Sequence, residues 1–215
     1  MNEWYYHKLL NYAGLISLRY KFIPLIINGK NMPIYAIEEN FSTRLLENNN
    51  KREGPIFRLQ NRESPEEPYV NQVTFYQTNK YKSTDNGRYL LRRVERQVSK
   101  FINGELKAKD VFEIKSMAKA YAISDVFGHD HPILAYNMRY YLNPISGLIE
   151  PIPYDQQEIK LVKVRGLIGE RNKHYRDTTL YSDKIISYLF RDKEFSREYG
   201  KALNKFSKKD WLDEF

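Results

Sequence analysis

Asn28-Gly29 stands between two short runs of apolar and β-branched residues, and this pair constrains the fold more than any other feature of the chain. Both residue types tolerate the positive φ angles that a tight turn between antiparallel strands requires. The pattern therefore predicts a hairpin with strands at 22–27 and 34–37. A second hairpin is predicted at 138–142 and 148–152, where the two runs are joined by the Gly-containing loop "NPISG".

Helical spacing of apolar residues predicts helices before, between and after these hairpins. The expected helices cover residues 3–12, 43–47, 88–101, 110–127, 182–191 and 194–205. Apolar runs at 55–59 and 70–76 predict two more strands, and the polar stretch 60–87 is interpreted as an insertion or a junction between lobes. The predicted fold class is α+β, with a strand-rich first part and a helical end.

The composition narrows the classes of function without choosing one. A chain of 215 residues with 41% hydrophobic content can bury a sizeable core. The net charge of +8 favours anionic partners, which include nucleic acid, acidic surface polymers and nucleotide phosphates. The absence of cysteine excludes disulfides, thiolate zinc sites and a cysteine nucleophile. Neither a signal peptide nor an apolar stretch long enough to span a bilayer is predicted.

Polar side chains gather around the second hairpin. His129, Asp130 and His131 follow the glycine that ends a predicted helix, a place where polar groups are exposed on a rigid support. Asn137 precedes the first strand of the hairpin and Asp155 follows the second. Because a hairpin brings its two ends together, Asn137 and Asp155 are expected to be neighbours. Amide and carboxylate oxygens without a thiolate suit a hard cation such as Mg²⁺.

Simpler interpretations of the same residues stay open. Asp130 between two histidines is also typical of a solvated loop, and an asparagine at the start of a strand commonly bonds the backbone. Asp155 follows two prolines and also suits a turn. A zinc pair formed by His129 and His131 is disfavoured. Basic residues elsewhere alternate with acidic ones, no RNA-binding signature accompanies the tyrosines and no P-loop glycine pattern is present, so nucleic-acid binding is disfavoured.

Several motifs in order resemble the CotH (spore coat protein H-like) kinase family. The stretch "IPLIINGKNMPIYAIEENF" resembles the family's hairpin, and "GHD", "YNMRYYL", "NPISG" and "PIPYDQQ" resemble its later motifs. A weaker likeness extends over most of the chain. The resemblance implies a minimal atypical protein-kinase-like fold as a single domain over 1–215. Its approximate lobes are a nucleotide-covering part at 1–87 and a catalytic part at 88–215.

The resemblance also implies roles for five residues. Asp130 corresponds to the catalytic aspartate that orients the acceptor hydroxyl, and Asn137 and Asp155 correspond to Mg²⁺ ligands. Arg58, in "REGPIFRL", corresponds to the basic residue that binds the ATP phosphates, and Glu39 to its ion-pair partner. Arg58 is equally well interpreted as a surface strand residue. The implied activity is transfer of the ATP γ-phosphoryl group to serine or threonine of a surface or coat protein.

The sequence departs from the family pattern at two positions of the last motif. Tyr154 stands where the family has tryptophan, and Gln157 where it has a second carboxylate, a change expected to weaken metal binding. The usual strand-rich lead-in and the export signal are also expected to be missing, although family members are associated with the cell surface, the spore coat or secretion. The alternative hypothesis is therefore a non-catalytic surface or spore-coat assembly module with the same fold.

Overall fold

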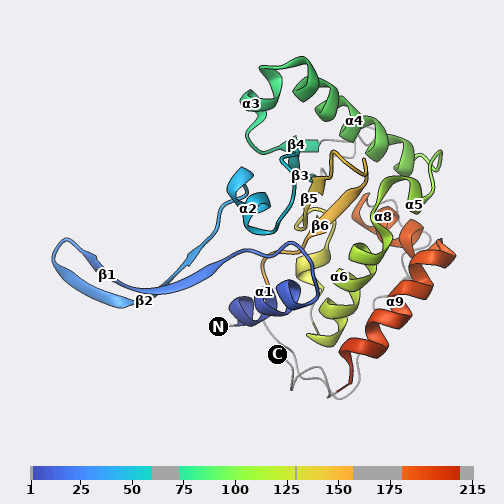
Figure 1. Ribbon diagram of the computed structural model, residues 1–215. Coiled ribbons are helices and arrows are strands. Elements are labelled where there is room, and N and C mark those ends of the chain that lie inside the picture. Colours follow the sequence, from blue (N-terminus) through green and yellow to red (C-terminus); the bar gives the residue numbers. More distant parts are fainter. Residues whose placement is uncertain (1, 60–72, 129, 157–180, 209–215) are drawn as a thin grey trace, which may run out of the picture.

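The computed structural model describes residues 2–59, 73–128, 130–156 and 181–208 (Figure 1). Its elements follow in chain order: α1 (Asn2–Tyr12), β1 (Tyr20–Ile27), β2 (Lys30–Glu38), α2 (Thr43–Asn48), β3 (Ile56–Leu59), β4 (Val73–Phe75), α3 (Thr78–Lys82), α4 (Asp85–Ile102), α5 (Ala108–Val111), α6 (Ile114–Val126), the 3-10 turn η1 (His131–Ile133), β5 (Arg139–Leu142), β6 (Ile149–Ile152), α8 (Tyr181–Arg191) and α9 (Lys193–Phe206). Within the described residues every predicted element appears in the predicted order, but α3 and η1 were not predicted and the predicted helix over 110–127 is divided. None of the described helices is long and apolar enough to cross a membrane.

Strands β1 and β2 form a two-stranded antiparallel arm that projects away from the rest of the protein (Figure 1). Its turn has two residues, Asn28 and Gly29, with φ angles of 51° and 77°. The sequence predicted this turn correctly but placed the start of the second strand four residues too late, since β2 begins at Lys30. Much of the arm's apolar surface faces solvent, and Ile26 and Ile34 are 66% and 74% exposed.

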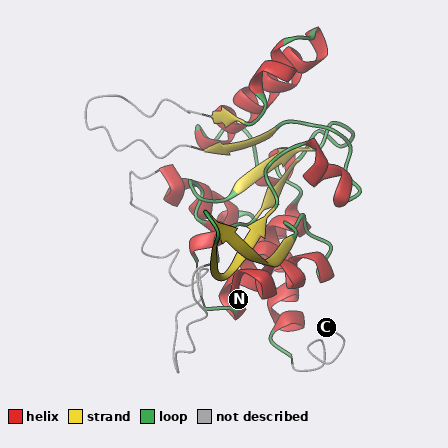
Figure 2. Ribbon diagram, turned by 90° about the vertical axis from the view of Figure 1, so that its left-hand side faces the viewer, coloured by secondary structure: helices red, strands yellow, loops and turns green. Residues whose placement is uncertain are grey.

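The second sheet has the strand order β4-β3-β5-β6, and each neighbouring pair in it is antiparallel. Because β3 pairs with β5, the sheet joins strands from the first and second halves of the chain. The strands lie in the middle of the molecule with helices on both sides (Figure 2). The predicted division into lobes at residue 87 stays a prediction.

The four-stranded sheet separates two hydrophobic cores, because successive residues of a strand point to opposite faces. The larger core contains Phe57, Tyr140, Leu142 and Ile149 of the sheet, together with buried residues of α1, α4, α6, α8 and α9. The smaller core contains Ile56, Tyr141 and Ile152 on the other face, packed against Phe41 and against Leu45 and Leu46 of α2.

One predicted helix is divided in the structure. The sequence indicated a single helix over 110–127, whereas α5 ends at Val111 and α6 begins at Ile114. Between them, the backbone N–H of Glu113 donates to the carbonyl oxygen of Ile149 at 2.9 Å, and its carboxylate accepts from the backbone N–H of Ser116 at 2.7 Å. Glu113 therefore caps α6 and bonds to β6, which is why the helix is interrupted although no glycine or proline is present.

The mixed α+β fold class is confirmed, with the hairpin arm in the N-terminal part and a helical C-terminal region. The two C-terminal helices α8 and α9 match their predicted ranges to within one residue at each end. Helix α9 packs along α6, so the end of the described chain closes the larger core.

Candidate functional site

The ends of the β5–β6 hairpin meet at Asn137. Arg139 and Ile152 are partners in the strand register, so the chain just before β5 lies beside the chain just after β6. The side-chain amide nitrogen of Asn137 donates to the carbonyl oxygen of Tyr154 at 2.9 Å and to that of His131 at 3.0 Å. Because both partners are acceptors, the NH₂ group must face them, which fixes the orientation of the amide. The Oδ1 atom points away from these two carbonyls and is left to accept a ligand.

Asp155 follows Tyr154 in a left-handed conformation, with a φ angle of 65°. Such a conformation is uncommon for a residue with a side chain and is maintained only where surrounding contacts require it. Two contacts do so here. The backbone N–H of Asp155 donates to Glu3 Oε1 at 2.7 Å, and Oδ2 lies 2.9 Å from His131 Nε2. The other carboxylate oxygen, Oδ1, forms no hydrogen bond with the described residues, and the side chain is 38% exposed.

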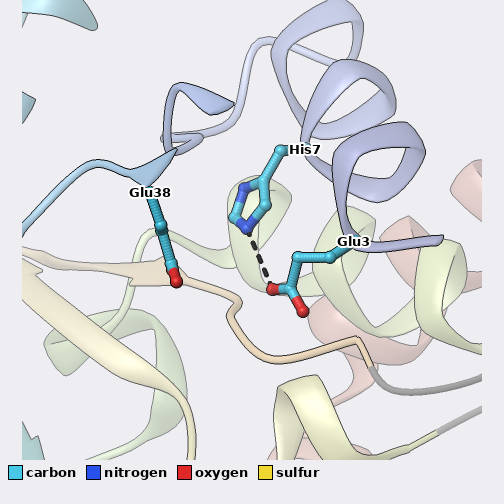
Figure 3. Close-up of side chains that lie close together, drawn as sticks. All are labelled: Glu3, His7 and Glu38. Carbon is cyan, nitrogen blue, oxygen red and sulfur yellow. Dashed lines mark hydrogen bonds and ion pairs between the residues drawn. The ribbon is translucent and has the colours of Figure 1, made fainter. Parts of the chain in front are cut away.

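Glu3, His7 and Glu38 form a cluster next to Asp155, in which one potential ligand atom from each lies within 4.8 Å of the others. Figure 3 shows Glu3 and His7 extending from α1 toward Glu38, which comes from the end of β2. The backbone N–H of Leu18 donates to His7 Nδ1 at 3.0 Å, so the ring proton is on Nε2, which lies 3.3 Å from Glu3 Oε1. A metal at Nε2 would displace that proton to the nitrogen already facing a donor. The cluster is therefore better suited to supporting Asp155 than to binding a metal.

The two carboxylates of this cluster differ in their electrostatics. Burial by itself would raise the pKa of Glu3, but hydrogen bonds from His7 and from the backbone N–H groups of Asp155 and Gln156 lower it overall. Burial raises the pKa of Glu38, and the negative charges of Glu3 and Asp155 add to the increase against a hydrogen bond from Tyr20. Glu3 is thus held as an anion at the start of α1.

Removing the Glu3 carboxylate is expected to destabilise the protein. In Glu3→Ala, the backbone N–H groups of Asp155 and Gln156 lose their acceptor. We expect the free energy of unfolding to fall by about 1–3 kcal/mol, as for other buried donors left without a partner. Urea denaturation of the variant and the parent measures this difference. Glu95→Ala, at an exposed position of α4, is the control, and an equal change in both variants would contradict the supporting role of Glu3.

Arg58 and Glu39 lie on different elements and do not pair. Glu39 follows β2, and the antiparallel arm sets it opposite Arg19, with which it forms an ion pair of 2.8 Å. Its Oε1 atom also accepts from the side-chain amide of Asn48 at 2.5 Å. The ion-pair partner of Glu39 in the structure is therefore Arg19, whereas the family resemblance implied Arg58. Arg58 lies in β3 with Arg139 of β5 as its register partner, and within the described ranges no carboxylate forms an ion pair with it.

Asp130 is the N-cap residue of the short 3-10 turn η1, and its carbonyl oxygen accepts from the backbone N–H of Ile133 at 3.0 Å. The next residue in this turn, His131, contacts Asp155 through its side chain and Asn137 through its carbonyl oxygen. Asp130 is thus the chain neighbour of His131, the residue that contacts both Asn137 and Asp155. Gln157 and His129 lie outside the described residues.

Sequence reasoning gave no role to Glu3, His7 or Arg139. One local signal was present for the first two, because residues four apart on a helix share a face, as Glu3 and His7 do on α1. No local signal connects Glu3 with Asp155, which is 152 residues further along the chain.

The site thus belongs to a class in which amide and carboxylate oxygens gather at the end of a β-hairpin beside arginine side chains, an arrangement suited to a divalent cation and phosphate groups. The chain belongs to the CotH kinase protein family, whose family model matches residues 1–210. This confirms the resemblance found in the sequence motifs. No curated protein matches the chain. The family is described as one of kinases, a class that uses ATP and Mg²⁺ in general.

Proposed function

We propose that the protein is an ATP-dependent kinase that transfers the γ-phosphoryl group to a serine or threonine hydroxyl of a surface or coat protein. The observation that carries the proposal is the fixed amide of Asn137. Its NH₂ group is committed to two carbonyl oxygens, one of them that of Tyr154, so that Oδ1 can bind a ligand beside the segment that carries Asp155. Oxygen donors of this kind fit Mg²⁺, and no thiolate competes because the chain has no cysteine.

Each residue has a defined part in the proposed reaction. Asn137 and Asp155 would hold Mg²⁺, which neutralises charge on the phosphates when bound. Arg58 would contact the phosphates with its guanidinium group. The carboxylate of Asp130 would accept the proton of the acceptor hydroxyl while the oxygen of that hydroxyl forms a bond to the γ-phosphorus. The bond between the γ-phosphorus and the bridging oxygen breaks in the same step, and ADP leaves with that oxygen.

His131 and Glu3 would maintain the geometry of the site. Through its side chain His131 contacts Asp155 Oδ2, and through Glu3 the N-terminal helix holds the backbone of Asp155 in its left-handed conformation. These contacts leave one carboxylate oxygen of Asp155 to face a cation. They partly offset the absence of a second carboxylate at position 157, where the chain has glutamine.

Titration of Mg²⁺-ATP with thermal unfolding as the readout tests the proposal. At a ligand concentration of about 100 times the dissociation constant, binding to the folded state should add about 2.7 kcal/mol to the free energy of unfolding of the parent. Asp155→Ala should lose most of this gain. Glu47→Ala, at an exposed position of α2, is the matched control and should retain it. Omitting Mg²⁺ should reduce the effect in the parent and in the control.

Two outcomes would count against the kinase. One is the absence of any stabilisation by Mg²⁺-ATP in a folded parent, which would favour the non-catalytic assembly module. The other is equal stabilisation of the parent and Asp155→Ala, which would mean that the nucleotide binds away from the end of the β5–β6 hairpin. Transfer of a labelled γ-phosphoryl group to candidate acceptor proteins is the following step, once binding is established.

A further inference from the structure

Two arginines lie side by side on the four-stranded sheet. Arg58 of β3 and Arg139 of β5 are direct partners in the strand register. Neighbouring residues Phe57 and Tyr140 belong to the larger core, so alternation along the strands turns both arginines to the opposite face. Directly opposed residues on adjacent strands have Cα atoms about 4.5–5.5 Å apart. Two arginine side chains thus start from opposed positions on one face of the sheet, and like charges directly opposite each other destabilise a sheet.

No acidic side chain neutralises this pair within the part of the chain that the structure describes. Glu150 shares the same face, but its carboxylate forms an ion pair of 2.6 Å with Lys51. Burial raises the pKa of Glu38 and the charge of Arg139 partly opposes this increase, yet no ion pair forms between the two side chains. The fold therefore maintains a double positive charge with no matching carboxylate.

Arg139 is also fixed in position by aromatic residues. Its guanidinium carbon lies 4.8 Å from the centre of the Tyr154 ring and 5.3 Å from that of Phe41. Its Nε atom donates to the Tyr76 hydroxyl at 2.9 Å. Ring contacts of this kind orient a guanidinium without neutralising its charge. Arg139 is a cation whose geometry is set before any ligand arrives.

The guanidinium lies next to the proposed metal ligands. Its Nη1 atom donates to the carbonyl oxygen of Asn137, two residues earlier in the chain. A guanidinium has five N–H groups, and the two hydrogen bonds to Tyr76 and Asn137 leave about three for another acceptor. These remaining donors belong to a guanidinium that is bonded to the backbone of Asn137, and its residue is the strand partner of Arg58.

We propose that Arg139 and Arg58 together bind the terminal phosphates of a nucleoside polyphosphate, with Arg139 as the fixed member of the pair. This inference rests on the proposed kinase function and adds Arg139 as a binding residue. Charge-assisted hydrogen bonds from two arginines suit the closely spaced negative oxygens of β- and γ-phosphates. Because Arg139 adjoins the proposed metal ligand Asn137, the α-phosphate and the nucleoside would lie further away.

The test compares the affinities of ATP, ADP, AMP and inorganic tripolyphosphate for the parent and for Arg139→Gln, measured by calorimetry in Mg²⁺. We expect the variant to bind ATP and tripolyphosphate about 10- to 100-fold more weakly, the loss typical of hydrogen bonds to charged groups. Its affinity for AMP should change less than about twofold. Arg92→Gln, at an exposed position of α4, is the matched control. The ratio of ATP to AMP affinity is the key quantity, because partial unfolding would weaken the binding of both ligands alike.

Two further variants keep the test independent of folding defects. Arg139→Lys keeps the charge, and Tyr76→Phe keeps the ring but removes the hydrogen bond to Nε. Both should lower the ATP to AMP ratio by less than Arg139→Gln. An unchanged ratio in all three variants, with a parent that binds ATP, would overturn this inference and leave the kinase proposal in place. A folded parent that binds no nucleotide would overturn both.

Discussion

Replacing Asp130 by asparagine is expected to reduce phosphoryl transfer by about 10²- to 10⁴-fold, the usual contribution of a positioned general base. Asparagine has nearly the same shape but cannot accept the proton of the acceptor hydroxyl. The backbone hydrogen bond that Asp130 makes in the turn η1 is retained in Asp130→Asn. The rate of labelled γ-phosphoryl transfer is the measurement, and Mg²⁺-ATP affinity should stay close to that of the parent.

Asp85→Asn provides the control for the Asp130 experiment. The Asp85 side chain is fully exposed in the first turn of α4, so its replacement should leave transfer unchanged. If Asp130→Asn transferred the phosphoryl group at the parent rate, Asp130 would have no role in the reaction. A loss of ATP binding equal to the loss of transfer would instead assign Asp130 to nucleotide binding.

The largest expected loss of stability follows from Phe195→Ala. Phe195 is fully buried at the start of α9, and its ring lies 5.0 Å from that of Phe190 and 5.7 Å from that of Tyr121 in α6. Truncation leaves a cavity where three helices meet, and we expect the free energy of unfolding to fall by about 3–5 kcal/mol. Urea denaturation measures the change.

Tyr89→Ala is the matched control for Phe195→Ala. It removes an aromatic ring of similar size, but Tyr89 is 54% exposed on α4, so its effect should stay within about 0.5 kcal/mol. Similar losses in the two variants would mean that the contact of α9 with α6 contributes little to the stability of the core. A small loss for Phe195→Ala alone would mean that neighbouring side chains fill the cavity.

The sequence predicted those elements that are specified by residues close together in the chain. Asn28 and Gly29 specify the turn of the arm through their own backbone preferences, and the structure has them at positive φ angles. The division between α5 and α6 was not predicted, because it depends on a hydrogen bond from Glu113 to Ile149, 36 residues away (149 − 113). Apolar spacing continues through this point, so the pattern favoured one helix.

The same distinction applies to the candidate site. Hairpin geometry correctly predicted that the chain around Asn137 and the chain around Asp155 would meet. The roles of these residues, and those of Asp130, Arg58 and Glu39, stay predictions. Sequence patterns could not reveal that Glu3 contacts Asp155 or that Arg139 lies beside Arg58, since both contacts depend on how distant segments pack.

The hairpin arm contributes no residue between positions 21 and 37 to either hydrophobic core. Its own order therefore depends on the strand pairing and the Asn28-Gly29 turn, while the stability of the body depends on the cores. Local opening of the arm and global unfolding of the body are then separate equilibria. As a consequence, substitutions at positions 21–37 during evolution need no compensating changes in the cores.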